Sequence, residues 1–353
     1  MVLKDIRVLD FTQYLAGPTV TRFMAEMGAD IIKIERAPNG DPCRMLPAVK
    51  NGRSGYFVQQ NQKKRSLCID LNHESTNDIM LELVKNVDVV VENYGPGVME
   101  KRGWDFESLK KINPKLVMAS VSAFGRESPL SHKTGFDWIV QAFAGLMHMT
   151  GPSDGPPHPV GVGIADINAG VHAATAIGYS LFHRERTGEP VYCDISMVDC
   201  LFQMQEATIQ VNQITDGAYI PKRMGAHHQL LCPCGVFNGA DGYVALLITQ
   251  QQWPNMCKAM ERPDLETDPR FAQSEERAKN QEILIPIIEE WLQTWPDNQS
   301  ALAHLEDNRV PCGPVLSPMD AMEHEYFSER GILRDVSDPV LGEMRLPGFP
   351  LRF

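Results

Sequence analysis

The stretch IRVLDFTQYLAGPTVTRFMAEMGADIIKIE, residues 6–35, switches twice between two residue patterns. Its ends, Ile6–Phe11 and Ile31–Glu35, are apolar runs of the length of a buried strand. Between them Thr19–Met27 has helical spacing, and Pro18 suits the first turn of a helix. A strand, a helix and a second strand in this order predict a unit in which the two strands run parallel.

The same alternation continues to residue 124. Further strands are predicted at Ser66–Leu71, Val87–Glu92 and Leu116–Phe124, and helices at Thr76–Lys85 and Trp104–Ile112. We therefore expect an α/β fold with a doubly wound, mostly parallel sheet that helices cover on both faces.

Loops that follow strand ends are the usual ligand-binding positions in such a sheet. Here these loops are Thr12–Pro18, Arg36–Arg44 and Asn93–Gly97. No GxGxxG motif follows the first strand, which argues against a nicotinamide-dependent dehydrogenase.

From about Cys232 the pattern changes, which predicts a smaller second domain. Gly235–Ile248 is typical of a β-hairpin that turns at Gly239–Gly242. Pro and Gly crowd Pro311–Pro318, which predicts a linker that leaves this domain. Helices are expected at Gln252–Met260, Glu275–Trp295 and Ser300–Asn308.

The composition excludes several classes of protein. The 353 residues carry a formal net charge of −12, which argues against an extended nucleic-acid surface. No run of about 18 apolar residues predicts a membrane span. The eight cysteines form no CxxC pair and are expected to be free thiols in a cytoplasmic protein. No HExxH motif accompanies His227-His228, so we expect no metal site.

The segment GVGIADINAGVHAATAIG, residues 161–178, places Asp166 between a glycine-rich loop and a run of small residues. A helix that starts there has Asp166 at or near its N-cap, where negative charge is favoured. Asp166 by itself is also compatible with an ordinary capping residue. The small residues allow close approach, either of a neighbouring helix or of a ligand.

Motifs along nearly the whole chain resemble those of the family III CoA-transferases, the CaiB/BaiF group that includes formyl-CoA:oxalate and carnitine CoA-transferases. No single motif decides the resemblance, which rests on their number, order and spacing. They are DFTQYLAGP, GADIIKIERAPNGDPCR, NQKKRSLCIDL, VENYGPG, GFDWIVQAFAGLMHMTGPSDGPP, the segment around Asp166, TGEPVYCDISMVD and VPCGPV.

The resemblance implies a Rossmann-like large domain built from both chain ends, with a smaller α+β domain inserted. Residues 1–225 then form the first part of the large domain, 226–310 the small domain, and 311–353 a linker and the return. It also implies a homodimer of two subunits threaded through each other as interlocked rings. Relatives usually continue beyond PGFPLRF with a proline-rich tail, whereas this chain stops at Phe353.

The resemblance further implies that Asp166 is the nucleophile. It attacks an acyl-CoA thioester to give a mixed anhydride, and CoA thiolate returns to give an aspartyl-CoA thioester. Backbone N–H groups of the GVGIA loop are candidates for stabilising the oxyanions. CoA is then a substrate and no cofactor is permanently bound.

Other positions match the family's contacts with CoA and substrate. Leu15 and Ala16 match the lining of the substrate channel, where formyl-CoA transferase has glutamine in place of Leu15. This difference argues against a formyl-CoA or oxalate activity. Three positions match the surroundings of the nucleotide part of CoA: Arg36, Asn93 and Lys101. Ile69–Asn72 matches the adenine edge. The remaining contacts with CoA and substrate are matched by Lys133, Phe136 and Asp137.

Three activities stay open. The leading interpretation is CoA transfer between carboxylic acids, with GLMHMTGPSDGPP and GAHHQLLCP closer to the members that use dicarboxylates. Racemases of 2-methylacyl-CoA carry histidine where this chain has Phe136, and only His132 nearby offers a second base. The third is a non-catalytic CoA-binding protein.

Overall fold

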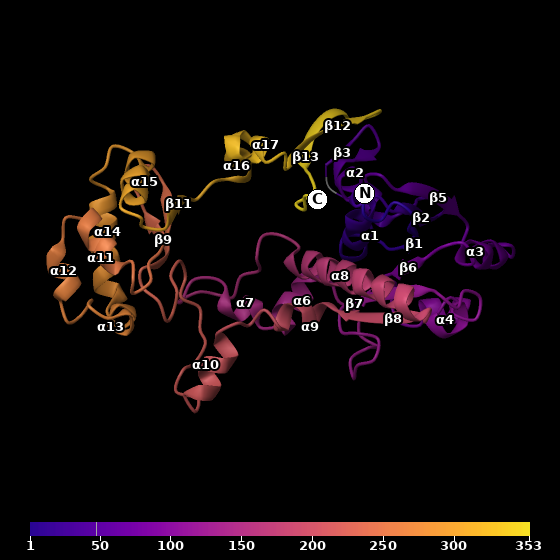
Figure 1. Ribbon diagram of the computed structural model, residues 1–353, viewed down its shortest axis with the longest axis horizontal. Helices are drawn as coiled ribbons and strands as arrows, with labels where there is room; N and C mark the ends of the chain where they lie inside the picture. The colour runs from indigo at the N-terminus through magenta and orange to yellow at the C-terminus, as the bar shows by residue number, and fades with distance from the viewer. Residues whose placement is uncertain (47) are drawn as a thin grey trace. The chain divides into compact units, whose positions relative to one another are not determined.

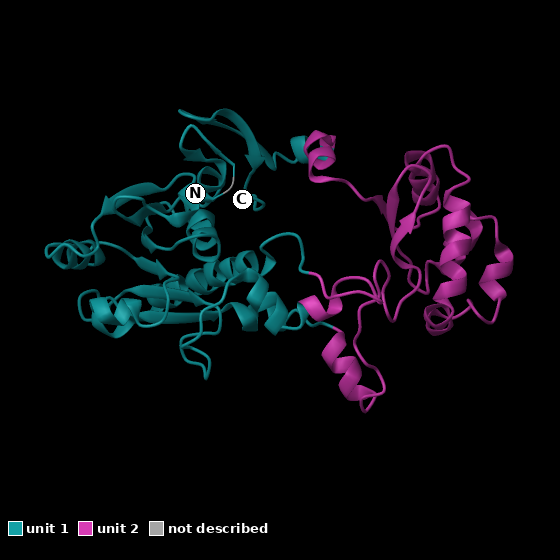
Figure 2. Ribbon diagram, turned by 180° about the vertical axis from the view of Figure 1, so that it is seen from behind, with its two compact units in different colours: residues 1–146, 159–206, 326–353 teal, residues 147–158, 207–325 magenta. Residues whose placement is uncertain are grey.

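The computed structural model describes residues 1–46 and 48–353, which form two compact units. Unit 1 contains residues 1–146, 159–206 and 326–353, and so draws on both ends of the chain (Figures 1 and 2). Unit 2 contains residues 147–158 and 207–325. These divisions differ from the expected boundaries, because residues 147–158, 207–225 and 311–325 also belong to unit 2.

Unit 1 is built on a six-stranded sheet in the order β5-β2-β1-β6-β7-β8, with all pairs parallel. The strand order reverses between β1 and β6, which makes a topological switch point where ligands usually bind. The parallel α/β fold is confirmed, and so are the five predicted strands; β8 was not predicted. The strands are β1 (Arg7–Phe11), β2 (Asp30–Arg36), β5 (Arg65–Ile69), β6 (Val89–Glu92), β7 (Val117–Ser122) and β8 (Val191–Ser196) (Figure 1).

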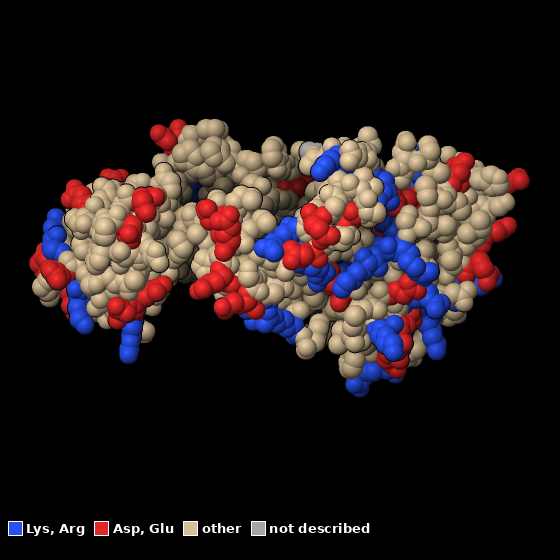
Figure 3. All heavy atoms as spheres, turned by 90° about the horizontal axis from the view of Figure 1, so that it is seen from above, with Lys and Arg blue, Asp and Glu red and all other residues tan. Residues whose placement is uncertain are grey.

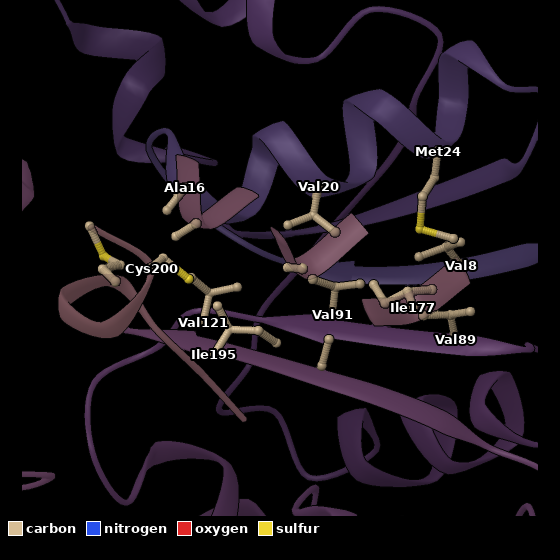
Figure 4. Packing of buried hydrophobic residues seen from close by; sticks show 14 of the residues in the cluster. Val8, Ala16, Val20, Met24, Val89, Val91, Val121, Ile177, Ile195 and Cys200 are labelled. Carbon is tan, nitrogen blue, oxygen red and sulfur yellow. The ribbon is translucent and has the colours of Figure 1, made fainter. Parts of the chain in front are cut away.

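Each face of the sheet carries its own apolar core, because successive residues of a strand point to opposite faces. Val8 lies in the core beneath α1 (Ala16–Glu26) and α8 (Ile164–Thr187), whereas Leu9 lies in the other core. Figure 4 shows Met24 of α1 pointing towards the strands in the first core. The second core is covered by α3 (Thr76–Val84), α4 (Val98–Arg102) and α5 (Phe106–Leu109).

The helix expected over Trp104–Ile112 is shorter in the structure, where α5 covers Phe106–Leu109. It begins there because the side chain of Asp105 accepts a hydrogen bond from the Ser108 N–H and caps the helix. Other elements were not predicted individually: η1 (Pro42–Met45), β3 (Val49–Lys50), β4 (Arg53–Ser54), α2 (Gly55–Gln60), α6 (Asp137–Phe143), α7 (Leu146–Met149), α9 (Met197–Phe202), α17 (Glu325–Glu329), β12 (Leu333–Asp338) and β13 (Gly342–Pro347).

Helix α8 confirms the helix predicted at Asp166, which stands third in it after the N-cap Gly163. Its small residues admit α1 at close range. A Cβ on Gly170 would lie 2.6 Å from the Cβ of Thr19 and 2.9 Å from the carbonyl oxygen of Ala16. At this position the small residue therefore serves helix packing.

Unit 2 contains an antiparallel sheet in the order β11-β10-β9. The predicted hairpin is confirmed as β9 (Cys234–Asn238) and β10 (Tyr243–Leu247). The linker predicted at Pro311–Pro318 is wrong in part, because Cys312–Pro314 forms β11 and pairs with β10. An edge strand tolerates proline, which explains the misleading composition.

Unit 2 also contains helices, and those between residues 253 and 307 enclose, together with this sheet, a separate apolar core. The helix expected over Glu275–Trp295 is divided at Asn280 into α13 and α14. The helices are α10 (Thr208–Ile214), α11 (Trp253–Ala259), α12 (Pro263–Thr267), α13 (Ser274–Lys279), α14 (Gln281–Leu292), α15 (Asn298–Asp307) and α16 (Pro318–Glu323).

Within residues 1–46 and 48–353, no helix combines the length and the apolar character that a membrane crossing requires. In the same residues, His, Cys, Asp and Glu side chains form no group of three that could hold a metal ion. All eight cysteines are free thiols.

Candidate active site

A pocket of about 220 Å³ lies at the switch point of the sheet. Residues 13–16, which follow β1, and residues 93–96, which follow β6, form two of its walls. The end of β7 with the chain after it, residues 121–124 and 133–136, forms another. Asp166 at the start of α8 also lines the pocket. The position is the one that the strand order favours for a ligand.

The structure brings six of the predicted site residues together on the wall of this pocket. They are Leu15, Ala16, Asn93, Lys133, Phe136 and Asp166. Asn93 also holds the opposite loop, because its side chain accepts a hydrogen bond from the Gln13 N–H and donates one to the Gln13 carbonyl, both at 2.8 Å.

The other five predicted residues do not line the pocket. Arg36 and Ile69 end β2 and β5 and are partners in the sheet register, so they share the carboxyl edge with the pocket loops. Asn72 follows at the same edge and accepts a hydrogen bond from Arg102 at 3.2 Å. Lys101 is exposed on α4. The fifth, Asp137, is buried at the start of α6.

The carboxylate of Asp166 is half-buried, and none of the described residues donates a hydrogen bond to it. Burial raises the pKa of Asp166 from 3.8 to about 7, and the negative charge of Asp137 adds to this rise. The group is therefore a more basic carboxylate than an ordinary aspartate, and near pH 7 a substantial part of it is ionised.

The side chain of Asp137, which belongs to α6, caps the N-terminal end of α8. Its Oδ1 accepts hydrogen bonds from the N–H groups of Ala165 at 2.7 Å and Asp166 at 3.1 Å. Its Oδ2 accepts one from Gln141 Nε2 at 2.5 Å. Gln141 Oε1 in turn accepts a hydrogen bond from the Val160 N–H at 2.9 Å. One buried carboxylate thus connects α6, α8 and the loop before the helix.

Gly163 allows the walls of the site to approach each other. A Cβ at this position would lie 2.5 Å from Leu15 Cδ2, closer than real Cβ contacts. The same Cβ would lie 3.8 Å from both Asp137 Oδ1 and Asp166 Oδ2, so the two carboxylates flank Gly163. Glycine at 163 leaves room for the end of the Leu15 side chain, which would have to move if a Cβ were present.

Buried ion pairs fix the loop that follows β1. Lys33 Nζ lies 2.9 Å from Asp41 Oδ2 and donates a hydrogen bond to the Thr12 carbonyl at 2.6 Å. Asp41 Oδ1 accepts from the Tyr14 N–H at 3.3 Å, where Tyr14 has a left-handed φ of 63°. Buried charges with these partners define one loop conformation, because leaving either group unpaired is costly.

A second buried pair lies beside the first. Lys64 Nζ is 3.2 Å from Asp10 Oδ2 and donates a hydrogen bond to the Pro18 carbonyl at 3.2 Å. Burial lowers the pKa of Lys64 to about 8, although Asp10 opposes this change. For Asp10, burial acts to raise the pKa, but the charges of Lys64 and Lys33, together with hydrogen bonds from Thr12 and Thr21, lower the pKa to about 2. These residues support the pocket loop from behind.

Three residues near the site were missed from the sequence. Tyr14 lines the pocket and packs edge-on against Phe136, with ring centroids 5.7 Å apart. Arg126 also lines it and is anchored by Glu92 at 2.9 Å. Burial raises the pKa of Tyr56 in α2 to about 12, and the charge of Asp166 contributes, so a protonated phenol lies near the nucleophile candidate. Tyr14 and Arg126 carried a usable signal, because both lie in loops that follow strand ends, whereas Tyr56 carried none.

Basic side chains near the carboxyl edge have a physical use in binding a polyanion. On the face drawn in Figure 3, several Lys and Arg side chains lie next to one another on unit 1, although the chain is acidic as a whole. Among the described residues that line the pocket, the positively charged side chains are Arg126 and Lys133.

The raised pKa of Asp166 has a consequence for stability. The folded protein holds the Asp166 proton more tightly than the unfolded chain does, so the free energy of unfolding falls as pH rises from about 4 to about 7. We expect Asp166→Asn to unfold at a higher temperature than the parent at pH 8, with a gain of about 2 kcal/mol after allowance for partial exposure. Thermal unfolding at pH 8 and pH 4 measures this; an equal difference at both pH values would contradict it.

Comparisons with known proteins show the family of the chain and agree with its fold. The model of the family described as CoA-transferase family III matches residues 3–353. The chain is 39% identical to succinyl-CoA:mesaconate CoA-transferase of Haloarcula hispanica, over 99% of this chain and 89% of that protein. It is 33% identical to succinyl-CoA:glutarate CoA-transferase of Mus musculus, over 99% of this chain and 80% of that protein.

A solved structure is similar over the same extent. The crystal structure of a CaiB/BaiF family protein from Brucella suis superposes with a TM-score of 0.86 at 32% identity, covering 99% of this chain and 92% of that one. The family model, the relatives and this structure cover nearly the whole chain. The chain therefore belongs to CoA-transferase family III, whose enzymes use CoA thioesters as substrates.

Proposed function

We propose that this CoA-transferase moves CoA from an acyl-CoA thioester to a dicarboxylic acid, with Asp166 as the nucleophile. The proposal depends on one observation: the carboxylate of Asp166 is partly buried, which raises its pKa, and it lines a pocket at the switch point of the sheet. The dicarboxylate class is supported by two relatives, whose names give mesaconate and glutarate as acceptors.

The reaction divides into four exchanges at carbonyl carbons. A carboxylate oxygen of Asp166 attacks the thioester carbonyl, the C–S bond breaks, and a mixed anhydride and CoA thiolate form. The thiolate attacks the Asp166 carbonyl of the anhydride and releases the donor acid. The acceptor carboxylate attacks the resulting aspartyl-CoA thioester, the C–S bond breaks, and a second mixed anhydride and CoA thiolate form. The thiolate then attacks the acceptor carbonyl, which yields the new acyl-CoA and free Asp166.

Each exchange passes through a tetrahedral oxyanion, which needs N–H donors placed in advance. The N–H groups of Ala165 and Asp166 are occupied by Asp137, and the Ile164 N–H donates to the Val162 carbonyl. Among the described residues, the N–H groups of 161–163 have no acceptor. We assign them as the oxyanion donors, which restricts the loop prediction to its first three residues.

The remaining site residues are proposed to hold CoA. Leu15, Ala16, Lys133 and Phe136 contact the pantetheine arm and the acyl group, since they share the pocket with the nucleophile. The nucleotide end lies along the same edge of the sheet, where basic and amide side chains suit its phosphates and adenine. Residues proposed there are Arg36, Ile69, Asn72, Asn93 and Lys101.

CoA enters and leaves as a substrate, and no permanently bound cofactor is proposed. The cytoplasm is the proposed location because free thiols persist in a reducing compartment.

Racemisation at the α-carbon is less well supported. It needs two acid/base groups on opposite faces of that carbon. Phe136 carries no titratable group, and His132 is exposed and is not part of the described pocket wall. A racemase would incorporate deuterium from heavy water at the α-carbon of a 2-methylacyl-CoA.

The proposed activity is tested with succinyl-CoA as donor and a panel of mono- and dicarboxylic acids as acceptors. We expect new acyl-CoA thioesters with dicarboxylates, detected by chromatography and mass, and none with Asp166→Asn. Transfer to monocarboxylates alone would contradict the substrate class. Retained CoA binding without transfer to any acceptor would favour the non-catalytic alternative.

We propose that two copies of the chain form the interlocked dimer of this family. The face of α8 away from α1 exposes apolar side chains, with Tyr179 at 73% and Phe182 at 60% exposure. Trp138 on α6 is exposed to 62%. Apolar surface of this kind is typical of an interface. Light scattering during size-exclusion chromatography should give the mass of a dimer at all concentrations tested, and a monomer would contradict the proposal.

A further inference from the structure

Asp137 is one of the residues expected to contact substrate, but its surroundings indicate another use. Its side chain belongs to the buried set, with the residue 8% exposed, and it is not on the described pocket wall. Both of its carboxylate oxygens accept hydrogen bonds from protein groups. A carboxylate so occupied has little capacity left for a substrate.

The hydrogen bonds of Asp137 serve the first turn of α8. The leading N–H groups of a helix have no partner within the helix, and an N-cap side chain usually accepts one of them. The N-cap of α8 is Gly163, which has no side chain. Asp137 of α6 takes that place and accepts from the N–H groups of Ala165 and Asp166.

Gln141 extends the same arrangement to the loop. It is fully buried, donates to Asp137, and accepts from the Val160 N–H. Val160 immediately precedes residues 161–163, whose N–H groups are the proposed oxyanion donors. The carboxylate of Asp137 is therefore joined to the nucleophile on one side and to the oxyanion loop on the other.

We propose that Asp137 is a positioning residue, which caps α8 from outside and, with Gln141, holds the Asp166 nucleophile and the oxyanion loop in register. The inference rests on the proposed function, because it assigns how that site is assembled. It also explains why the Asp166 carboxylate faces the pocket without a backbone N–H partner. The nearest such donors are already occupied by Asp137.

The arrangement has an electrostatic side as well. Asp137 of α6 and Tyr56 of α2 are the described titratable groups that interact with Asp166, while Arg126 and Lys133 lie on the same pocket wall. The charge of Asp137 adds to the effect of burial in raising the pKa of Asp166. A neutral residue at 137 should therefore let Asp166 ionise at lower pH.

Two substitutions separate the cap from the charge. Asp137→Ala removes both, and we expect kcat to fall about 100-fold, the cost of misplacing reacting groups by about 1 Å. Asp137→Asn keeps an oxygen that can accept from the N–H groups of α8, but it loses the negative charge. The new amide N–H groups face the donor N–H groups of Gln141, so the hydrogen bond between residues 137 and 141 is lost. We expect a smaller fall in kcat, with the acid limb of the kcat profile moved to lower pH than in the parent.

The double variant Asp137→Asn, Gln141→Glu provides a rescue. The introduced asparagine can accept from α8 and donate to the introduced glutamate. That glutamate can accept from the Val160 N–H, so every hydrogen bond is restored with one donor reversed. We expect the double variant to recover most of the kcat lost in Asp137→Asn. Gln141→Glu alone places two carboxylates together and should be more impaired than the double variant.

Amide hydrogen exchange needs no enzyme turnover, so it can test the role of Asp137 even if the proposed activity is wrong. Hydrogen exchange of the Ala165 and Asp166 amides should be at least about tenfold faster in Asp137→Ala than in the parent. Asp297→Asn, which alters the cap of α15, is the matched control and should change neither this exchange nor the pH profile. Unchanged exchange, an unmoved acid limb in Asp137→Asn, or no rescue would overturn the proposal. A parent enzyme without transferase activity would refute the function but leave the exchange result readable.

Discussion

Alanine in place of Asp166 is expected to reduce CoA transfer by about a thousandfold or more, because removing a covalent nucleophile eliminates every intermediate of the exchange. The loss should appear in kcat with every donor and acceptor. CoA binding should survive, since most of the pocket wall remains. Initial rates with succinyl-CoA, together with calorimetric titration of CoA, measure both quantities.

Asp199→Ala is the matched control for this variant. Asp199 also stands third in a helix, in α9, but it is exposed and does not belong to the described pocket wall. Its removal costs only the interaction with the helix dipole, on the order of 0.5 kcal/mol. We expect nearly normal transfer. Transfer that persists at the parental rate in Asp166→Ala would rule out a covalent role for this side chain.

Gly170→Ala is expected to destabilise unit 1 even though alanine is the better helix former. The added Cβ would lie 2.6 Å from the Cβ of Thr19 and 2.9 Å from the carbonyl oxygen of Ala16, which is backbone and cannot rotate away. Overpacking of this kind costs about 1–3 kcal/mol, more than the roughly 1 kcal/mol that alanine contributes through helix propensity. Urea unfolding should show a lower midpoint.

The displaced contact also bears on activity. Ala16 lines the pocket, so a shift of α1 should raise the KM for acyl-CoA in the same variant. Gly55→Ala is the control, because a Cβ at this position in α2 meets nothing within 4 Å. It should leave the urea midpoint unchanged or slightly higher. A midpoint in Gly170→Ala at or above that of Gly55→Ala would contradict the close packing of α1 and α8.

The sheet was predictable because each strand of its buried part is a short apolar run between polar loops. β8 (Val191–Ser196) was not predicted, because Asp194 ends its apolar run after Val191–Cys193 and the strand lies at the edge of the sheet. β11 was missed because Pro314 suggests a loop, although an edge strand has room for proline. Composition indicates strands best where both neighbours and both faces are covered.

The candidate site was predictable in part for a similar reason. Parallel strands end at one edge, so the loops that carry Leu15 and Asn93 had to meet there. The role of Asp137 depends on hydrogen bonds to residues 28 and 29 positions later in the chain. Contacts at that separation follow from packing of α6 on α8, and neither periodicity nor spacing in the sequence encodes them.

The most direct test is peptide mass spectrometry of the parent enzyme quenched during turnover with succinyl-CoA. The peptide that contains Asp166 should carry CoA as a thioester, and hydroxylamine should convert that side chain to a hydroxamate; Asp166→Asn should show neither. An enzyme that turns over while this peptide stays unmodified, or that carries the adduct on another residue, would show that the acyl group and CoA are passed on without Asp166.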